Sequence, residues 1–329
     1  MEVSINHSAK LLGQANYIVL TTHIHPDGDA MGSLLALYAY LRAQGKCVKM
    51  LLDDEVPRSF KFLADWDKIE SPQARVHEAD LLVILDASDL ERIGKVKDVV
   101  KAPILNIDHH ISNLKFADYW HIDSQAAATG ELIYRLLTEV DATITGSIAT
   151  ALFTAIATDC GFFRYANTSA QTLKIASELV GLGAKPHVIS EYLDTKPRAV
   201  IEILPKVLET LEVIDCGVNG QIAMLTLNQE ILANFRDDTE GFINYPRNIE
   251  GVEIAIMFKE TDESNTRVSL RSKSVDVSQL ALAFGGGGHA RAAGCTITES
   301  LSKAKTLIID AAKQQMAKTA GVNHAKRDN

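Results

Sequence analysis

The densest group of chemically versatile side chains lies in residues 23–29, where histidines and aspartates alternate with turn-forming residues (His-Ile-His-Pro-Asp-Gly-Asp). Carboxylates and imidazoles are side chains that bind divalent metal ions of intermediate hardness. Proline, glycine and aspartate are also common turn residues, so this segment alone fits a polar turn as well as it fits a metal site. Its chemistry therefore depends on what other segments place beside it.

Two later apolar runs end in the same residue types. Residues 81–85 run straight into Asp86, and residues 104–107 run into Asp108, His109 and His110. The carboxyl ends of neighbouring parallel strands open on one crevice, so side chains at three successive strand exits are expected to converge there. Carboxylates a few ångström apart cannot all stay ionised at neutral pH. The pattern therefore predicts bound cations.

A further carboxylate, Asp159, follows the apolar helical run 149–158. The helix dipole disfavours an anion at that end by roughly 0.3 kcal/mol or more, which a cation would offset. Taken alone, Asp159 also fits a solvent-facing position before the turn at Gly161. The combined donors are oxygen and imidazole without thiolate, which suits Mn²⁺ or Mg²⁺ better than a structural zinc site.

The number of candidate ligands indicates two metal ions. Five or six ligands exceed the need of one ion that keeps positions open for water and substrate, whereas two ions can share a bridging carboxylate. Such a pair generates hydroxide near neutral pH and neutralises a phosphoryl group during in-line attack. Phosphoester hydrolysis is therefore the expected chemistry.

A second motif consists of four consecutive glycines, residues 285–288, followed by His289 and Arg291. A backbone without Cβ atoms can approach an anion closely and turn its N–H groups toward it. The motif is thus typical of a phosphate or carboxylate cradle, although a glycine run standing alone is more readily a flexible hinge.

Composition limits the class of protein. The 329 residues are 47% hydrophobic and 23% charged, which indicates a folded chain of about two domains. The net charge of −9 argues against stable binding of long nucleic acid, which needs a basic face. No export signal, no long uncharged apolar stretch and no close cysteine pair is visible, so we expect a cytoplasmic protein with reduced thiols and no membrane contact.

The elements around these motifs indicate an α/β fold. Continuous apolar runs at 17–21, 47–52, 81–85 and 104–107 are typical of a parallel sheet covered on both faces. Helical periodicity follows at 30–42, 130–139, 148–158 and 170–182. We therefore predict a doubly wound, mainly parallel sheet with helices on both faces. Alternating segments at 221–226, 252–258 and 267–270, with a hairpin turn at 262–265, predict a smaller C-terminal α+β domain.

The domain boundary is expected near residue 200. Pro197 and Pro205 favour breaks in the amphipathic stretch 188–214. We assign residues 1–190 to a metal-binding catalytic domain, 191–210 to a linker, 211–318 to a substrate-binding domain and 319–329 to a flexible tail. The active site is expected in the cleft between the domains.

Taken in order, these motifs resemble the DHH phosphoesterase superfamily with its DHH-associated C-terminal domain. They are His23-x-x-x-Asp27-x-Asp29, Asp86, Asp108-His109-His110, Asp159 and the glycine run with its histidine. The resemblance spans nearly the whole chain and is greatest to the bacterial nanoRNase group, whose members cleave very short RNA and often dephosphorylate 3′-phosphoadenosine 5′-phosphate.

The resemblance implies a role for each residue. One Mn²⁺ would be held by His23, Asp27 and Asp86, and a second by Asp29, Asp86, His109 and Asp159, with Mg²⁺ or Co²⁺ as substitutes. Catalytic roles would fall to Asp108, which orients an imidazole, and to His110, at the substrate phosphate or leaving oxygen. The substrate would be bound by Arg271, Gly287, Gly288, His289 and Arg291. His25 is not counted as a ligand, and its role is left open.

The substrate is less well defined than the chemistry. Short RNA or DNA oligonucleotides and small nucleotides are the expected partners, with 3′-phosphoadenosine 5′-phosphate among them. A linear or cyclic dinucleotide phosphodiesterase, or a noncatalytic nucleotide-binding module, are the alternatives. The residues leave the polarity of attack and the oligomeric state open, with a homodimer as the commonest default.

Overall fold

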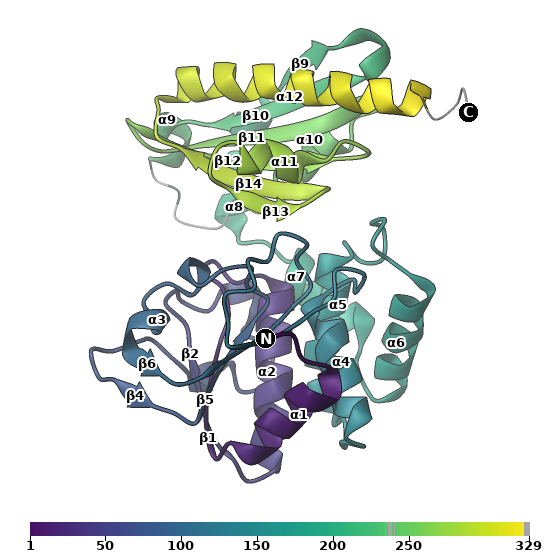
Figure 1. The fold of residues 1–329 in the computed structure, drawn as a ribbon. Coiled ribbons are helices and arrows are strands. Elements are labelled where there is room, and N and C mark those ends of the chain that lie inside the picture. Colours follow the sequence, from purple (N-terminus) through teal and green to yellow (C-terminus); the bar gives the residue numbers. More distant parts are fainter. Residues whose placement is uncertain (234, 236–238, 240, 326–329) are drawn as a thin grey trace. The chain divides into compact units, whose positions relative to one another are not determined.

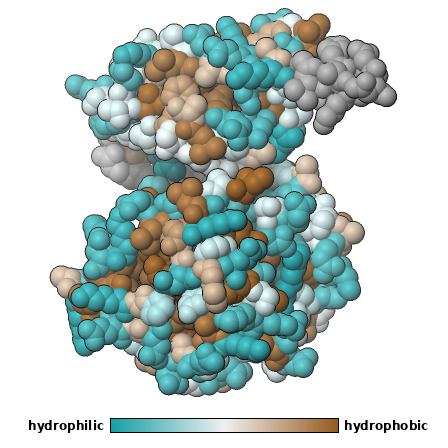
Figure 2. Space-filling view, viewed as in Figure 1, coloured by the Kyte–Doolittle hydropathy of each residue, from teal (hydrophilic) through white to brown (hydrophobic). Residues whose placement is uncertain are grey.

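The protein is described from a computed structural model that covers residues 1–233, 235, 239 and 241–325, with backbone alone for His289 and 320–325. The chain divides into two compact units, Met1–Thr195 and Lys196–Asn329 (Figure 1). Their surfaces are mostly hydrophilic on the face seen in Figure 2, with scattered apolar residues. All four cysteines are free thiols.

The first unit is built on a six-stranded parallel sheet with the order β3-β2-β1-β5-β7-β8. The order reverses between β1 and β5, which makes the sheet doubly wound with a switch point at that pair. Its strands are β1 (Tyr17–Thr21), β2 (Cys47–Leu51), β3 (Ile69–Glu70), β5 (Leu81–Leu85), β7 (Ile104–Asp108) and β8 (Tyr119–Ile122).

Long helices cover one face of this sheet. Helices α2 and α4 pack on the strands, α5 packs on both of these helices, and the three share one apolar core with α1, α6 and α7 (Figure 1). The other face carries a smaller core around Val19, Ile84 and Val96 beneath α3 and the short β4–β6 pair. The bounds are α1 (Ile5–Gln14), α2 (Gly28–Ala43), α3 (Val96–Val99), α4 (Thr129–Glu139), α5 (Gly146–Asp159), α6 (Ala170–Gly181), α7 (Pro186–Asp194), β4 (His77–Glu78) and β6 (Val100–Lys101).

Three glycines let α2, α4 and α5 approach one another closely. A Cβ added to Gly28 would lie 2.3 Å from Oγ1 of Thr158, and one added to Gly32 would lie 2.3 Å from the carbonyl oxygen of Ala151. A Cβ on Gly130 would meet the Ala155 side chain at 2.5 Å. We call Gly28, Gly32 and Gly130 the glycine seam. It fixes the helices whose ends carry Asp27, Asp29 and Asp159.

The second unit is a mixed sheet of six strands in the order β13-β14-β12-β11-β10-β9, in which only β10 and β11 pair in parallel. Helices α11 and α12 share an apolar core with one face, and α8 packs with the other. The bounds are β9 (Glu212–Asp215), β10 (Gln221–Leu227), β11 (Val252–Asp262), β12 (Asn265–Ser272), β13 (Gly287–His289), β14 (Ala292–Ile297), α8 (Arg198–Leu208), α9 (Gln229–Leu232), α10 (Asn244–Arg247), α11 (Val277–Leu282) and α12 (Leu301–Ala325).

The fold class is confirmed for both units, and the hairpin turn joins β11 to β12 as expected. The break expected at Pro205 is wrong, because Pro205 lies inside α8. A proline there leaves the carbonyl four residues earlier without its helical donor, and that residue, Ile201, is on the exposed side of the helix. The end of the chain is helical in α12 as far as Ala325, within the stretch for which a tail is expected.

Candidate metal centre

The first candidate ligands follow β1. Nδ1 of His23 lies 2.7 Å from the carbonyl oxygen of Ile24. A carbonyl only accepts, so Nδ1 carries the proton and Nε2 presents its lone pair. This Nε2 lies 3.5 Å from Oδ2 of Asp86 and 3.8 Å from Oδ2 of Asp27. The local backbone thus sets the tautomer that a metal ligand needs.

The two carboxylate oxygens of Asp27 have different roles: one caps helix α2 and the other lies at the candidate metal centre. It is the N-cap of α2, and Oδ1 accepts hydrogen bonds of 3.0 Å from the backbone N–H groups of Asp29 and Ala30. Oδ2, the oxygen nearer to His23, is left on the side of the centre. Capping the helix therefore also orients the carboxylate.

Asp29 is buried at the N-terminus of α4. Oδ2 accepts from the backbone N–H of Thr129 at 2.6 Å, and Oδ1 accepts from that of Gly130 at 2.8 Å and from Oγ of Ser33 at 3.0 Å. Helix N-termini stabilise anions through their unpaired N–H groups and the helix dipole. These donors hold the carboxylate in place beside the other acidic groups.

Asp86 occupies the centre of the cluster. It directly follows β5, is 2% exposed and has a φ of 54°, in the left-handed region. Oδ2 faces Nε2 of His23 at 3.5 Å, while Oδ1 faces Nε2 of His109 at 3.6 Å. One carboxylate whose two oxygens face two different imidazoles has the orientation required to bridge two ions.

His109 follows β7 and faces a set of carboxylates. Its Nε2 lies 3.6 Å from Asp29, Asp86 and Asp159, measured to the nearest carboxylate oxygen of each. Its Nδ1 lies 3.3 Å from the carbonyl oxygen of Ala126, which again leaves Nε2 directed at the cluster. Asp159, the last residue of α5, is the only one of these three carboxylates delivered by a helix C-terminus.

Asp108 and His110 form a pair beside this cluster. Oδ1 of Asp108 accepts from Nδ1 of His110 at 2.7 Å, and Oδ2 accepts from Nδ2 of Asn113 at 2.6 Å. With both oxygens engaged, Asp108 is placed to orient His110 rather than to bind an ion. Nδ1 of His110 also lies 3.6 Å from Oδ1 of Asp86.

Among the residues that the structure describes, three groups of ligand atoms lie close enough together to hold an ion, all within 4.8 Å of one another inside each group. The groups are His23 with Asp27 and Asp86, Asp29 with His109 and Asp159, and Asp86 with His109 and His110. The structure thus brings together all six residues expected as ligands, together with Asp108 and His110. The donor set of carboxylate oxygens and imidazole nitrogens fits a borderline-hard divalent ion.

Electrostatics favours cations here. Burial, with Asp86 and Asp159 nearby, raises the pKa of Asp29 well above its usual range. Burial raises the pKa of Asp159 to about 6, with Asp27 and Asp86 adding to the rise against the opposing effect of His109. Burial alone would lower the pKa of His110, but Asp108 and Asp86 outweigh it and raise the pKa to about 9. The centre therefore holds negative charge that it stabilises incompletely without metal.

Supporting residues that the motifs did not indicate hold these groups in place. Nδ2 of Asn106 donates to the carbonyl oxygens of Ile84 and Ala87, and Oδ1 of Asn106 accepts from Asn113 at 2.8 Å. These bonds tie the exits of β5 and β7 together. The sequence signal that could have indicated this role is the asparagine inside the otherwise apolar run 104–107, because a buried amide needs hydrogen-bond partners.

A buried glutamate supports the backbone around Ala126. Glu131 accepts hydrogen bonds of 3.2 Å from the backbone N–H of Ala127 and from Oγ1 of Thr172, and it pairs with Arg135. The adjacent carbonyl, that of Ala126, meets Nδ1 of His109. No sequence motif indicated Glu131: Arg135 lies four residues later on the same helix, as in many surface ion pairs, and the contact with Thr172 of α6 is tertiary.

The residues expected to bind substrate lie in the second unit, at the β13 end of its sheet. Gly287 and Gly288 belong to strand β13 rather than to an open loop, and the backbone of Arg271 is in register with Ala292 of β14. A Cβ on Gly288 would lie 2.6 Å from the Ala292 carbonyl oxygen. Among described residues, Nη1 of Arg291 is buried without a hydrogen-bond partner. The side chain of His289 lies outside the described part.

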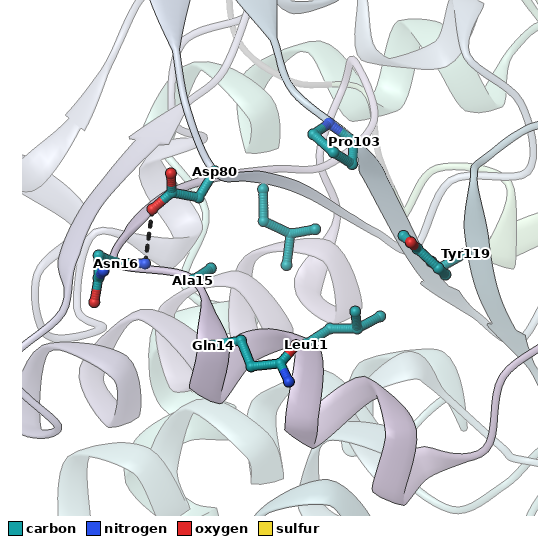
Figure 3. Close-up of a pocket in the computed structure, with 8 residues that line it drawn as sticks. Leu11, Gln14, Ala15, Asn16, Asp80, Pro103 and Tyr119 are labelled. Carbon is teal, nitrogen blue, oxygen red and sulfur yellow. Dashed lines mark hydrogen bonds between the residues drawn. The ribbon is translucent and has the colours of Figure 1, made fainter.

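A cavity of about 350 Å³ lies at the other edge of the first sheet, by the amino ends of its strands (Figure 3). It is lined by Leu11, Asp80, Pro103 and Tyr119, among others. Oδ2 of Asp80 accepts from the backbone N–H groups of Asn16 and Tyr17. The carboxylate therefore has a structural role, and this cavity offers no comparable cluster of ligands.

Two family profiles match the chain. The DHH family, N-terminal domain, covers residues 17–156, and the DHHA1 domain covers residues 226–318. The bifunctional oligoribonuclease and PAP phosphatase NrnA of Thermus thermophilus is 32% identical to this chain, over 92% of this chain and 90% of that protein. The chain belongs to the DHH phosphoesterase family. The expected family is thus confirmed.

Solved structures agree with this assignment. An exopolyphosphatase-related protein from Bacteroides fragilis superposes on the DHH phosphoesterase with a TM-score of 0.85 and 27% identity, over 96% of this chain and 97% of the other. RecJ from Thermus thermophilus, crystallised with Mn²⁺, has the same fold with a TM-score of 0.51 and 12% identity, over 95% of this chain and 55% of RecJ.

As a DHH phosphoesterase the protein is a hydrolase of phosphoester bonds, and members of this family use divalent metal ions. No helix within the described part of the chain is both long enough and apolar enough to cross a membrane.

Proposed function

We propose that this phosphoesterase hydrolyses short oligoribonucleotides and 3′-phosphoadenosine 5′-phosphate, using two divalent ions with Mn²⁺ preferred. The observation that carries the two-ion proposal is Asp86, whose oxygens face His23 on one side and His109 on the other. The substrate class is supported by the Thermus thermophilus relative, whose name states both activities.

The proposed ligands divide as the geometry suggests. His23, Asp27 and Asp86 would hold one ion, and Asp29, Asp86, His109 and Asp159 would hold the other, each through an atom already turned toward the centre. When bound, the ions supply a hydroxide near neutral pH and stabilise charge on the phosphoryl oxygens. The preference for Mn²⁺ follows from the mixed imidazole and carboxylate donors, with Mg²⁺ or Co²⁺ as substitutes.

His110 is proposed to act on the substrate. Asp108 holds its Nδ1, and the raised pKa keeps the ring protonated at neutral pH. A protonated imidazole beside the centre can donate a hydrogen bond to a phosphoryl oxygen or a proton to the leaving oxygen. Asp108 stabilises that charged form and fixes the ring.

The second unit is proposed to bind the rest of the substrate. A phosphate or terminal group would be engaged by Arg271, Gly287, Gly288, His289 and Arg291. The buried Nη1 of Arg291, without a partner among described residues, is the donor that supports this role best. With a net charge of −9 the chain has little means of holding a long nucleic acid backbone, so short substrates should be preferred.

The test is a comparison of substrates at fixed Mn²⁺. It would include a dinucleotide, a five-residue RNA, a twenty-residue RNA, 3′-phosphoadenosine 5′-phosphate, linear and cyclic di-adenylate, and polyphosphate. We expect the dinucleotide and 3′-phosphoadenosine 5′-phosphate to have the highest kcat/KM, and chelation to abolish turnover of both. Faster cleavage of the twenty-residue RNA or of polyphosphate would contradict the proposal.

A further inference from the structure

Arg92 lies on the loop that leaves β5 and stands beside the first candidate ligands. Its carbonyl oxygen accepts a hydrogen bond of 2.6 Å from the backbone N–H of Ile24, the residue after His23. Its own N–H donates to Oδ1 of Asp89 at 3.1 Å. The main chain of Arg92 is therefore fixed against the segment that carries His23.

The guanidinium of Arg92 has an unused donor. Its Nε is buried and has no hydrogen-bond partner among the residues that the structure describes, and no described carboxylate forms an ion pair with it. The main-chain hydrogen bond between Ile24 and Arg92 places Arg92 beside the segment that carries the His23 imidazole. A positive side chain thus lies near this imidazole with part of its hydrogen-bonding capacity unsatisfied, which costs free energy unless a ligand supplies the acceptor.

The acidic side chains around this loop already have other partners. Asp53 accepts from the backbone N–H and Nζ of Lys95. Asp54 accepts from the backbone N–H of His25 and pairs with its Nδ1. Asp89 is engaged by the backbone of Arg92. The local carboxylates therefore do not account for the guanidinium.

We propose that Arg92 is a substrate-binding residue whose guanidinium donates to a phosphate oxygen of the nucleotide, on the side of the centre formed by His23 and Asp27. Arginine suits this ligand because its planar group donates two hydrogen bonds to a phosphate at once and stays charged at all working pH values. The inference rests on the proposed function. The phosphate is either the one being hydrolysed or a second phosphate of the same substrate.

The experiment compares Arg92→Ala and Arg92→Lys with Lys95→Ala, which removes a positive charge three residues away on the same loop from a side chain that is 76% exposed. Bis(p-nitrophenyl) phosphate carries one phosphate, whereas 5′-phosphorylated di-adenylate carries two. We expect Arg92→Ala to lower kcat/KM about ten- to hundredfold on the dinucleotide, Arg92→Lys to lower it less, and Lys95→Ala to leave it within about twofold.

Comparing the two substrates shows which of the two phosphates Arg92 binds. Loss on both substrates assigns Arg92 to the phosphate being hydrolysed, and loss on the dinucleotide alone assigns it to the second phosphate. Added guanidinium should restore part of the activity of Arg92→Ala, which a purely structural role would not allow. Mn²⁺ affinity, measured by calorimetry, should match the wild type.

Two results would overturn the inference. The first is an Arg92→Ala enzyme as active as Lys95→Ala on both substrates. The second is a loss of activity explained by an equal loss of Mn²⁺ affinity and not rescued by guanidinium. If the wild-type protein hydrolyses no nucleotide, the proposed function fails, but Arg92 remains testable through calorimetric binding of inorganic phosphate to the Mn²⁺-loaded protein, which Arg92→Ala should weaken.

Discussion

Nδ1 of His110 donates to Oδ1 of Asp108 across 2.7 Å. This bond gives His110 a different role from that of its neighbour His109. Asp108 orients the ring of His110, and the raised pKa of His110 keeps this ring protonated beside Asp86. The same short motif therefore supplies a candidate ligand, His109, and a candidate proton donor that differ only in what their ring nitrogens meet.

Asp108→Asn should move the alkaline limb of the rate profile to lower pH. Asp108 helps to raise the pKa of His110 to about 9, so the wild-type ring stays protonated below that pH. Removing the negative charge lowers the pKa, and the protonated form is lost earlier as pH rises. The measurement is kcat from pH 6 to 10, with Asp80→Asn at the other edge of the sheet as the control. An unmoved alkaline limb would exclude His110 as the titrating acid.

Asp86→Asn should reduce kcat/KM by about a thousandfold or more, because it weakens both proposed ion sites at once. Asparagine is preferable to alanine here, since it tolerates the φ of 54° that residue 86 adopts. The fold should survive, as judged by circular dichroism and by a melting temperature without metal no lower than that of the wild type. Asp98→Asn, which changes an exposed carboxylate of α3, is the control, and activity within tenfold of wild type in Asp86→Asn would refute the shared-ligand assignment.

Asp159→Asn should stabilise the metal-free protein at alkaline pH. The pKa of Asp159 in the folded state is about 6, above the roughly 3.9 of an unfolded chain. A raised pKa gives stability that is complete below pH 4 and is lost as pH rises through about 6. At pH 8 the ionised wild-type carboxylate therefore costs on the order of 1–3 kcal/mol, which asparagine avoids.

The comparison is chemical denaturation of both proteins in chelator at pH 8 and pH 5. The advantage of Asp159→Asn should shrink at the lower pH, and added Mn²⁺ should stabilise the wild type more than the variant. An advantage equal at both pH values would show that charge at Asp159 is not its cause.

Arg291→Ala should impair nucleotide binding without impairing the chemical step. The side chain is proposed to grip a substrate phosphate or terminal group from the second unit, so KM for a dinucleotide should rise about tenfold. Slow hydrolysis of bis(p-nitrophenyl) phosphate, which is too small to need that grip, should be spared. Arg267→Ala, an exposed arginine of the same sheet, is the control. Equal losses on both substrates would mean that Arg291 supports the fold or the chemistry instead.

Much of the candidate centre was predictable because strand exits are local features of sequence. Asp86 and Asp108 each follow or end a buried strand, and parallel pairing then brings these ends to one edge. The sequence could not indicate contacts between residues that lie far apart along the chain. Thr129 meets Asp29 over 100 positions, and Arg92 approaches His23 from a different loop.

The local conformational preferences of proline and glycine gave incomplete predictions where tertiary packing outweighed them. Pro205 remains in α8 because the helix buries Val200, Ile203 and Val207 on one side, which offsets one lost hydrogen bond. Within the glycine run, for which an anion cradle or a hinge was expected, Gly287 and Gly288 pair in β13 with β14, and a side chain at Gly286 or Gly288 would strike the neighbouring strand. Neither outcome is encoded within a few residues.

The glycine seam has a mechanical consequence. With Gly28, Gly32 and Gly130 in direct contact with α5, the ends of α2 and α5 cannot move apart or together without disrupting close-packed atoms. The radius of the space between Asp27, Asp29 and Asp159 is therefore set by backbone packing rather than by the flexibility of the carboxylates. We therefore expect this frame to discriminate between ions by size, because Ca²⁺ needs bonds of about 2.3–2.6 Å and more ligands than a fixed frame of this kind can rearrange to supply.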